Sequence, residues 1–219
     1  MEPDNLALDR YILAQVDNPR PKVCFIPTAS GDAESYIFRF YDSFSQLECQ
    51  PSYLSLFRLP QADLEDFFLD KDILYVGGGN TRSMLTLWRE WGLDVVLQKA
   101  YQAGVVLAGI SAGANCWFEA CLTDSMPGRI SVLPGLGFLA GSFCPHFDSN
   151  PERRPAYHRF LLEGQIKPGY AADDSAAVHF VDDQLALVVC SRPSARVYHL
   201  ACPNGQVEEE QVIPQYLAD

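Results

Sequence analysis

The sequence predicts an α/β protein with a mostly parallel, doubly wound sheet flanked by helices and a small antiparallel part late in the chain. Two observations carry this prediction. Short apolar runs lack the alternation of a strand with one wet face, so they suit strands that are buried on both faces. Segments with apolar residues at helical spacing separate these runs, as expected for a parallel sheet with crossover helices. The runs lie at 22–27, 73–76 and 105–109.

Helices and strands alternate through the first half of the chain. The first amphipathic stretch ends at the Asn18-Pro19 break, and Gly92 separates two helical segments. The predicted elements are a helix at 6–16, a strand at 22–27, a helix at 33–47, a weak strand at 54–57, a short helix at 63–69, a strand at 73–76, two helices within 81–104 and a strand at 105–109.

The second half is less regular. We expect a helix over 112–118, a loop-rich stretch over 124–150 and a helix over 154–163. Three later apolar runs predict an antiparallel meander, at 176–180, 185–190 and 196–200.

Composition limits the partners and the location. With 16 basic and 28 acidic residues in 219, the net charge is −12, which disfavours nucleic acid and anionic membranes as partners. The acidic N-terminus is unlike a signal peptide and no apolar stretch approaches the length of a membrane span, so we expect a cytoplasmic protein. A chain of this size predicts one domain over residues 1–219. The sequence leaves the oligomeric state open, with a homo-oligomer as one alternative.

Cysteine and histidine spacing gives no sign of a metal site. The seven cysteines are an odd number scattered in apolar runs, which is typical of reduced core residues rather than a disulfide framework. No Cys-x-x-Cys pair or His-x-x-x-His motif occurs. We therefore expect neither a metal nor a cofactor.

The sharpest motif is Gly-x-Ser-x-Gly, with Ser111 between Gly109 and Gly113. It follows a predicted buried strand and precedes a helical stretch, the setting in which a strained turn exposes a nucleophilic hydroxyl. The N–H of Ala112 would then point at the oxyanion formed on a carbonyl substrate. The alternative is a serine in a tight glycine turn or a phosphate nest.

A second glycine loop, Gly77-Gly78-Gly79-Asn80-Thr81, follows the preceding strand. In a parallel sheet it emerges at the same edge as Ser111, so Gly79 could supply the second oxyanion donor. A dinucleotide fingerprint starting at Gly77 would need glycine at position 82, which is Arg82.

A serine nucleophile needs a general base and an acid that orients it. Of four histidines, His146 follows a short apolar run and suits the base best, while His179 sits within a strand-like run. Spacing does not choose among the candidate acids, which are Asp124, Asp173 and Asp174.

Together these motifs resemble the serine peptidase family of dipeptidase E (aspartyl dipeptidase) and cyanophycinase. The resemblance rests on Gly77 to Thr81, on the Ser111 motif, on Thr-Asp-Ser-Met-Pro at 123–127 and on Cys-Pro-His146-Phe, and it spans about 22–208. It implies a fold similar to class I glutamine amidotransferases, and so a single peptidase E-like domain. It also implies the roles of nucleophile for Ser111, base for His146, triad acid for Asp174 and oxyanion donors for Gly79 and Ala112.

The sequence departs from the aspartyl dipeptidase pattern at two places. Asp124 lies near a second acidic position of the family, but the register of the following Met-Pro pair puts Ser125 there. The arginine expected to hold an acidic substrate side chain has no unique counterpart, which leaves strict preference for N-terminal aspartate in doubt. The candidate substrate-binding residues are Asn80, Arg153, Arg154 and Arg159, of which each arginine could instead be a solvated charge on a helix face.

The sequence thus predicts a serine-type peptidase that hydrolyses short peptides through a Ser-His-Asp triad and an acyl-enzyme. One alternative is an esterase or amidase with the same triad, and another is a non-catalytic binding module of amidotransferase-like fold. A glutaminase is disfavoured because its chemistry uses cysteine where this chain has Ser111, and Cys116 lies five residues further on.

Overall fold

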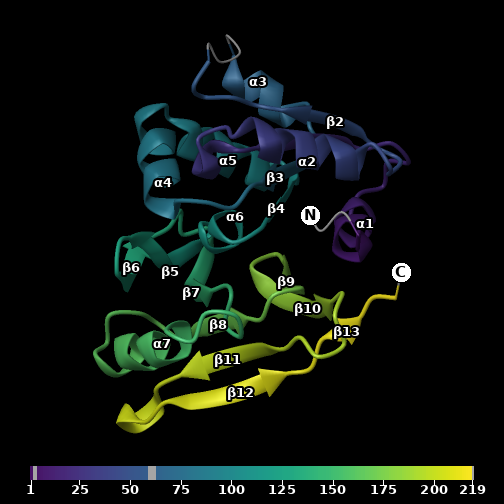
Figure 1. Ribbon diagram of the computed structural model, residues 1–219. Coiled ribbons are helices and arrows are strands. Elements are labelled where there is room, and N and C mark those ends of the chain that lie inside the picture. Colours follow the sequence, from purple (N-terminus) through teal and green to yellow (C-terminus); the bar gives the residue numbers. More distant parts are fainter. Residues whose placement is uncertain (2–3, 59–62, 219) are drawn as a thin grey trace. The chain divides into compact units, whose positions relative to one another are not determined.

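The computed structural model describes residues 1, 4–58 and 63–218, and these form two compact units, Met1–Ala114 and Asn115–Asp219 (Figure 1). Glu2, part of the acidic N-terminus, lies outside the described residues. Among the helices of the described part, none is both long enough and apolar enough to cross a bilayer. The expectation of one domain over 1–219 stays a prediction.

The first unit is built on a four-stranded sheet in which every neighbouring pair is parallel. The strand order β2-β1-β3-β4 puts β1 and β3 in the centre and β2 and β4 at the edges. The strands are β1 (Lys22–Ile26), β2 (Gln50–Tyr53), β3 (Ile73–Val76) and β4 (Val106–Gly109).

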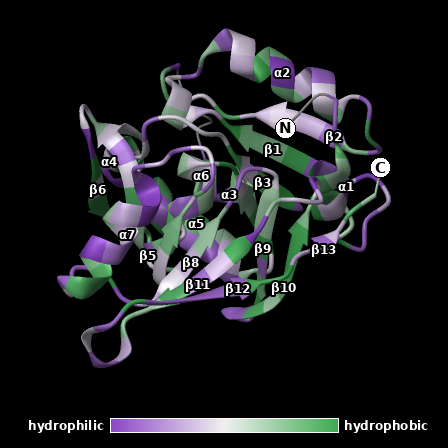
Figure 2. Ribbon diagram, turned by 60° about the horizontal axis from the view of Figure 1, so that its bottom comes forward, coloured by the Kyte–Doolittle hydropathy of each residue, from purple (hydrophilic) through white to green (hydrophobic). Residues whose placement is uncertain are grey.

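Burial of the central strands on both faces explains their unbroken apolar runs. Val23 to Ile26 have no exposed surface, and β1 carries hydrophobic colours along its length (Figure 2). The ring of Phe25 stacks on that of Phe40 with centroids 4.7 Å apart, which packs helix α2 (Glu34–Phe44) against the sheet. A buried aromatic or aliphatic side chain of this kind contributes about 1.5–3 kcal/mol.

Local capping signals set the starts of two other helices. The Asp63 carboxylate accepts the N–H of Asp66 at 3.0 Å at the start of α3, and Asn80 Oδ1 accepts the N–H of Ser83 at 2.9 Å at the start of α4. The predicted break at Gly92 is present, with φ +67°, a value that favours glycine. The remaining bounds are α1 (Ala7–Leu13), η1 (Thr28–Ser30), α3 (Leu64–Leu69), α4 (Thr81–Glu90), α5 (Leu93–Gln102) and α6 (Ala112–Asn115).

The second unit contains two sheets. A six-stranded mixed sheet has the order β12-β11-β8-β7-β5-β6, with β7 parallel to both β5 and β8 and the other pairs antiparallel. A three-stranded sheet has the order β13-β10-β9. The bounds are β5 (Phe118–Met126), β6 (Arg129–Pro134), β7 (Leu139–Cys144), α7 (Arg153–Leu162), β8 (Gly169–Ala172), β9 (Ala176–Val181), β10 (Gln184–Cys190), β11 (Val197–Ala201), η2 (Pro203–Gly205), β12 (Glu208–Val212) and β13 (Gln215–Tyr216).

The α/β class, with mostly parallel strands and flanking helices, is confirmed, but two expected elements, a strand and a helix, are wrong. The weak strand at 54–57 is instead β2, which ends at Tyr53. Pro51 obscured it, because proline is tolerated in a sheet chiefly at an edge, where β2 lies. The helix over 112–118 is one turn that ends at Asn115, and Phe118 begins β5. A short apolar run of this kind does not distinguish helix from strand.

The loop-rich stretch at 124–150 and the single late meander are also wrong. Residues 124–150 include β6 and β7. Of the three late runs, β9 and β10 pair antiparallel as expected, whereas β11 pairs with β8 and β12 in the other sheet. The pairing of β11 with β8 joins strands far apart in the sequence, so the periodicity of either segment does not reveal it.

Candidate active site

Ser111 occupies the turn between β4 and α6 in a left-handed conformation, with φ +57°. This conformation costs a residue with a side chain on the order of 1–3 kcal/mol and persists only where the surrounding structure enforces it. It is the backbone geometry that the Gly-x-Ser-x-Gly motif predicts.

The flanking glycines are required by close backbone approach. A Cβ on Gly109 would lie 2.1 Å from the carbonyl oxygen of Gly113, and a Cβ on Gly113 would lie 2.2 Å from that of Val76. A side chain at Gly109 would therefore disrupt the turn itself, and one at Gly113 would force the turn away from β3. These two contacts show that the turn requires both glycines, as expected for a nucleophile turn and equally for the alternative, a serine in a tight glycine turn.

The Gly77–Gly79 loop adjoins this turn. A Cβ built on Gly78 would lie 3.2 Å from Cβ of Ser111, so the two segments are in contact. The Gly78 N–H donates to the hydroxyl of Tyr36 at 3.0 Å and is thereby engaged. Gly79 has φ +140°, and a Cβ there would lie 2.1 Å from the Ala29 carbonyl oxygen. Tyr36, a residue of helix α2 that the sequence analysis did not single out, thus helps to shape the loop.

Ala112 begins helix α6, so its N–H has no carbonyl partner within its own helix. Cys116 follows that helix and is completely buried, and burial raises the pKa of its thiol well above the ordinary value. A thiol with a raised pKa is a poor nucleophile at neutral pH.

His146 and Asp174 meet in the second unit. His146 Nδ1 lies 2.6 Å from Asp174 Oδ1. An ionised carboxylate only accepts hydrogen bonds, so in this contact the proton lies on Nδ1 when Asp174 is ionised. His146 itself has φ +58°, and Ser175, directly after Asp174, has φ +67°. Both sides of the pair are therefore held in uncommon backbone conformations.

Two residues that the sequence analysis did not single out hold Asp174 in place. Asp148 Oδ1 accepts the Asp174 N–H at 2.9 Å, and Arg192 Nη2 donates to the Asp174 carbonyl oxygen at 2.8 Å. Arg192 Nη2 also contacts Asp148 Oδ2 at 2.6 Å. Only the position of Asp148, two residues after His146, could have suggested it, and no sequence signal points to Arg192.

The other two candidate acids have different partners. Asp173 Oδ2 accepts the Arg196 N–H at 2.9 Å, while among the described residues its buried Oδ1 has no hydrogen-bond partner. Burial raises the pKa of Asp173 above its ordinary value. The Asp124 carboxylate is 3.3 Å from Arg153 Nη2. Of the three carboxyl groups, Asp174 is the one recorded in contact with the His146 imidazole.

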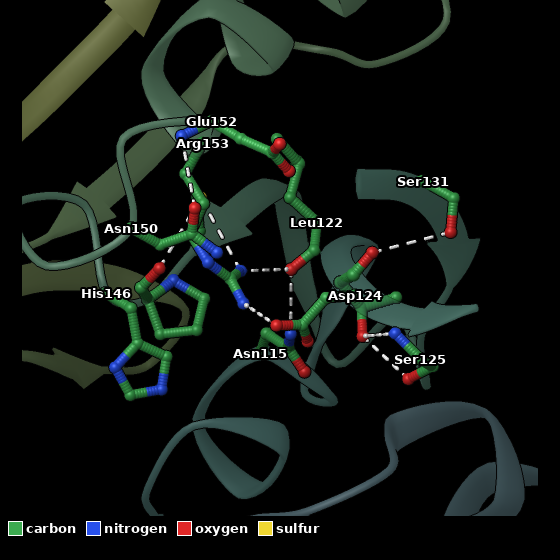
Figure 3. A network of polar contacts seen from close by, with 12 residues as sticks. Asn115, Leu122, Asp124, Ser125, Ser131, His146, Asn150, Glu152 and Arg153 are labelled. Atoms are coloured by element: carbon green, nitrogen blue, oxygen red, sulfur yellow. Dashed lines mark hydrogen bonds and ion pairs between the residues drawn. The ribbon is translucent and has the colours of Figure 1, made fainter. Parts of the chain in front are cut away.

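Arg153 belongs to the network of polar contacts that includes Asn150 and His146 (Figure 3). Its side chain is 3% exposed, and Nη1 donates to the Leu122 carbonyl oxygen at 3.1 Å. Its own N–H donates to the Asn150 carbonyl at 3.1 Å, and the Asn150 N–H donates to the His146 carbonyl at 3.2 Å. Arg153 is thus no solvated charge on a helix face.

The remaining candidate substrate-binding residues also have contacts within the chain. Arg154 pairs with Glu209 and lies over the Phe147 ring at 4.3 Å. Arg159 lies over the Phe160 ring at 4.7 Å. Asn80 uses Oδ1 as the cap of α4. Within the residues that the structure covers, no cluster of three or more His, Cys, Asp or Glu side chains is placed to hold a metal ion.

Comparison with known proteins identifies the family. The α/β fold and the strained serine turn define a serine hydrolase class of protein. The family model described as Peptidase family S51 matches residues 1–188, and the chain belongs to this family. It is therefore a serine-type peptidase, as the sequence predicted.

Individual relatives agree with this family. The chain is 53% identical to the uncharacterized peptidase YgaJ of Bacillus subtilis (strain 168) over 217 residues, which covers 99% of this chain and 94% of YgaJ. A crystal structure of a peptidase from an acI-B1 Actinobacterium is similar with a TM-score of 0.71 at 20% identity, covering 98% of this chain and 91% of that one. A Listeria monocytogenes EGD-e protein whose name assigns it to peptidase E has a TM-score of 0.57 at 17% identity, covering 96% and 94%. At these identities the two solved structures support the fold alone.

Proposed function

We propose that this serine-type peptidase hydrolyses short peptides, with Ser111 as the nucleophile, His146 as the general base and Asp174 as the acid that orients the imidazole. The observation that carries the proposal is the left-handed Ser111 between two glycines that no other residue could replace without a clash. The hydrogen bond between His146 Nδ1 and Asp174 supplies the second support.

In this mechanism Nε2 of His146 takes the proton of the Ser111 hydroxyl as its oxygen attacks the scissile carbonyl carbon. The tetrahedral intermediate collapses when the imidazolium protonates the leaving amine, which gives an acyl-enzyme. Water then attacks the ester, with the same imidazole as base, and releases the acid product and Ser111. Asp174 keeps the proton on Nδ1 and stabilises the imidazolium.

The N–H groups of Gly79 and Ala112 are the proposed oxyanion donors. Gly78 is the less suitable donor of its loop because its N–H already bonds to Tyr36. Ala112 adds the N-terminal end of α6, whose first N–H groups lack partners within the helix. Loss of one such donor costs about a hundredfold or more in turnover.

We further propose that the substrate need not begin with an aspartate. Arg153 is neutralised by Asp124, Arg154 by Glu209, and Arg159 lies against its neighbour Phe160. An arginine whose charge already has a carboxylate partner gains little from a second one. A substrate class of short peptides of mixed composition is therefore proposed on the basis of Arg153 and Arg154, whose charges already have carboxylate partners.

The cytoplasm is the proposed location. In the part of the chain that the structure describes, none of the seven cysteines forms a disulfide, and all but Cys202 are buried. Reduced, buried thiols are typical of a reducing compartment. A homo-oligomer and a single peptidase E-like domain over 1–219 remain part of the proposal, without nucleic acid or membrane partners.

Hydrolysis of a dipeptide and tripeptide panel by purified protein tests the proposal, with short-chain esters assayed beside it. Wild type should cleave peptides and Ser111→Ala should not, while Cys116→Ala should keep its turnover because that thiol takes no part. Hydrolysis of esters alone would favour the esterase alternative. Wild-type turnover in Ser111→Ala would remove the mechanism, and inertness of the wild type toward both panels would favour the binding-module alternative.

A further inference from the structure

The main chain of Asp174 is held at both of its polar groups by one ion pair. Its N–H donates to Asp148 Oδ1 at 2.9 Å, and its carbonyl oxygen accepts from Arg192 Nη2 at 2.8 Å. The ion pair itself closes at 2.6 Å between Arg192 Nη2 and Asp148 Oδ2. Asp148 and Arg192 therefore fix the peptide groups on either side of the Asp174 Cα, from which the carboxylate extends to His146.

These contacts join three segments that are distant in sequence. Asp148 lies two residues after His146, and between them the Phe147 N–H donates to the Ala172 carbonyl at 3.0 Å. Arg192 lies just after β10, where the Ser191 N–H donates to the Ser175 carbonyl at 2.9 Å. The segment that carries Arg192 is thus bonded to the residue directly after Asp174.

We propose that Asp148 and Arg192 are positioning residues, which hold the Asp174 carboxylate in register with His146 Nδ1 and so keep the imidazole in its productive orientation. The expected effect on kcat rests on the proposed function, whereas the expected effect on the hydrogen bond between His146 and Asp174 does not. The inference concerns a pair of residues that act through Asp174 and do not themselves touch the substrate.

Arg192 also balances the negative charge of Asp148. Asp148 and Asp174 are two carboxylates on adjoining segments, and Arg192 is the cation that contacts the first and the main chain of the second. Asp148 keeps its charge there: burial raises its pKa, but the Asp174 N–H and Arg192 outweigh burial, so that the pKa lies below the ordinary value.

An ordinary brace for the 191–196 loop would produce some of the same contacts. Arg192 Nη1 donates to Ser194 Oγ at 2.9 Å, and Arg196 Nη1 donates to the Pro193 and Ala195 carbonyls at 2.8 Å. Arg196 thus braces the same loop through its side chain without contacting Asp174, which makes Arg196→Ala the matched control for Arg192→Ala.

The test compares Arg192→Ala, Arg192→Lys, Asp148→Ala, the double variant Asp148→Ala/Arg192→Ala and Arg196→Ala with the wild type in the full-length protein. Two readouts are recorded. One is kcat and KM on a cleaved peptide, and the other is the far-downfield proton NMR resonance of the imidazole–carboxylate hydrogen bond, assigned by its loss in His146→Ala. Thermal unfolding checks that each variant is folded, and Arg192→Lys supplies a mild variant should the alanine substitutions fail to fold.

Displacement of a catalytic group by about 1 Å costs roughly a hundredfold, so Arg192→Ala and Asp148→Ala should lower kcat by about that factor with KM unchanged. The double variant should be no worse than either single one, because the two residues act as one unit. The downfield resonance should disappear or shift in all three. The kcat of Arg192→Lys should lie between those of Arg192→Ala and the wild type, because an ammonium can neutralise Asp148 but lacks the guanidinium fork. Arg196→Ala should match the wild type in both kcat and the resonance.

The inference is overturned if Arg192→Ala and Asp148→Ala keep both the resonance and kcat, or if kcat falls while the resonance stays unchanged. A fall of the same size in Arg196→Ala would also overturn it, since a loop brace would then suffice. Should Ser111→Ala prove as active as the wild type, the proposed function fails, yet the resonance still decides whether Asp148 and Arg192 position Asp174.

Discussion

The His146 imidazole and the Asp174 carboxylate are joined by a hydrogen bond of 2.6 Å. His146 has φ +58°, and Ser175, which directly follows Asp174, has φ +67°. A positive φ is unfavourable for a residue with a side chain, so the surrounding contacts must enforce these conformations. In the first unit the same holds for Ser111 at φ +57°. Backbone strain therefore occurs at two of the proposed triad residues and next to the third, a distribution common at functional sites.

Substitution of the neighbouring residues Asp173 and Asp174 tests which carboxylate orients the His146 imidazole. Asp174→Asn should lower kcat/KM by on the order of a thousandfold to ten-thousandfold, because an amide no longer fixes the proton on Nδ1 or stabilises the imidazolium. Asp173→Asn should stay near the wild type, because the amide oxygen can still accept the Arg196 N–H. Steady-state kinetics on one peptide decides. A larger loss in Asp173→Asn or Asp124→Asn would assign the role to that residue.

The Asp148 pair should make stability depend on pH in the acid range. The folded pKa of Asp148 lies below its unfolded value, because the Asp174 N–H and Arg192 outweigh the opposing effect of burial. Its stabilisation is therefore full above the unfolded pKa of about 3.9 and is lost as the pH falls through the lower folded value. Asp148→Asn should be less stable than the wild type at pH 7, and the gap in the free energy of unfolding should close toward pH 2. Denaturant unfolding at several pH values measures it, and a gap independent of pH would contradict the assigned pKa shift.

The glycines of the serine turn should resist substitution for steric reasons. Gly113→Ala puts a Cβ 2.2 Å from the Val76 carbonyl oxygen, and overpacking of this kind costs about 1–3 kcal/mol. Gly104→Asn is the control: Gly104 has φ +87° with no atom within 4 Å of a built Cβ, and asparagine tolerates positive φ. Denaturant unfolding of both variants checks the difference. Equal stability of the two would mean that the turn can separate from β3 at little cost.

Substrate choice should show little preference for an N-terminal aspartate. Asp-Leu and Asn-Leu are nearly isosteric dipeptides that differ in charge, so their ratio of kcat/KM isolates the contribution of a cationic side chain. A charge-assisted hydrogen bond from an unpaired arginine contributes about 1.5–3 kcal/mol, equivalent to tenfold or more. With Arg153 and Arg154 already paired to carboxylates, the ratio should stay near one. A preference for Asp-Leu of more than about tenfold would show that an arginine is available to the substrate.

Sequence reasoning predicted the parts of the site that local chemistry encodes. The Ser111 turn needs two glycines within five residues, and the Gly77–Gly79 loop follows a recognisable buried strand, so both were visible in the sequence. Contacts between residues far apart in the sequence were not visible in this way. Arg192 reaches Asp148 across 44 positions, and nothing in the neighbourhood of Arg192 indicates that its side chain holds Asp174. The strand β7 was missed for a related reason, because neither of its partners, β5 and β8, directly adjoins it in the sequence, whereas β6 pairs with β5, which directly precedes it.

Reaction with a fluorophosphonate probe tests the central claim most directly, because the probe reports an activated serine without any assumption about the substrate. Mass mapping of the labelled wild type should find one adduct, on Ser111, and Ser111→Ala should remain unlabelled. In His146→Ala the rate of labelling should fall by about a thousandfold or more, as expected when a triad base is lost. Labelling at another residue, or labelling of Ser111 at the same rate in His146→Ala, would contradict the account.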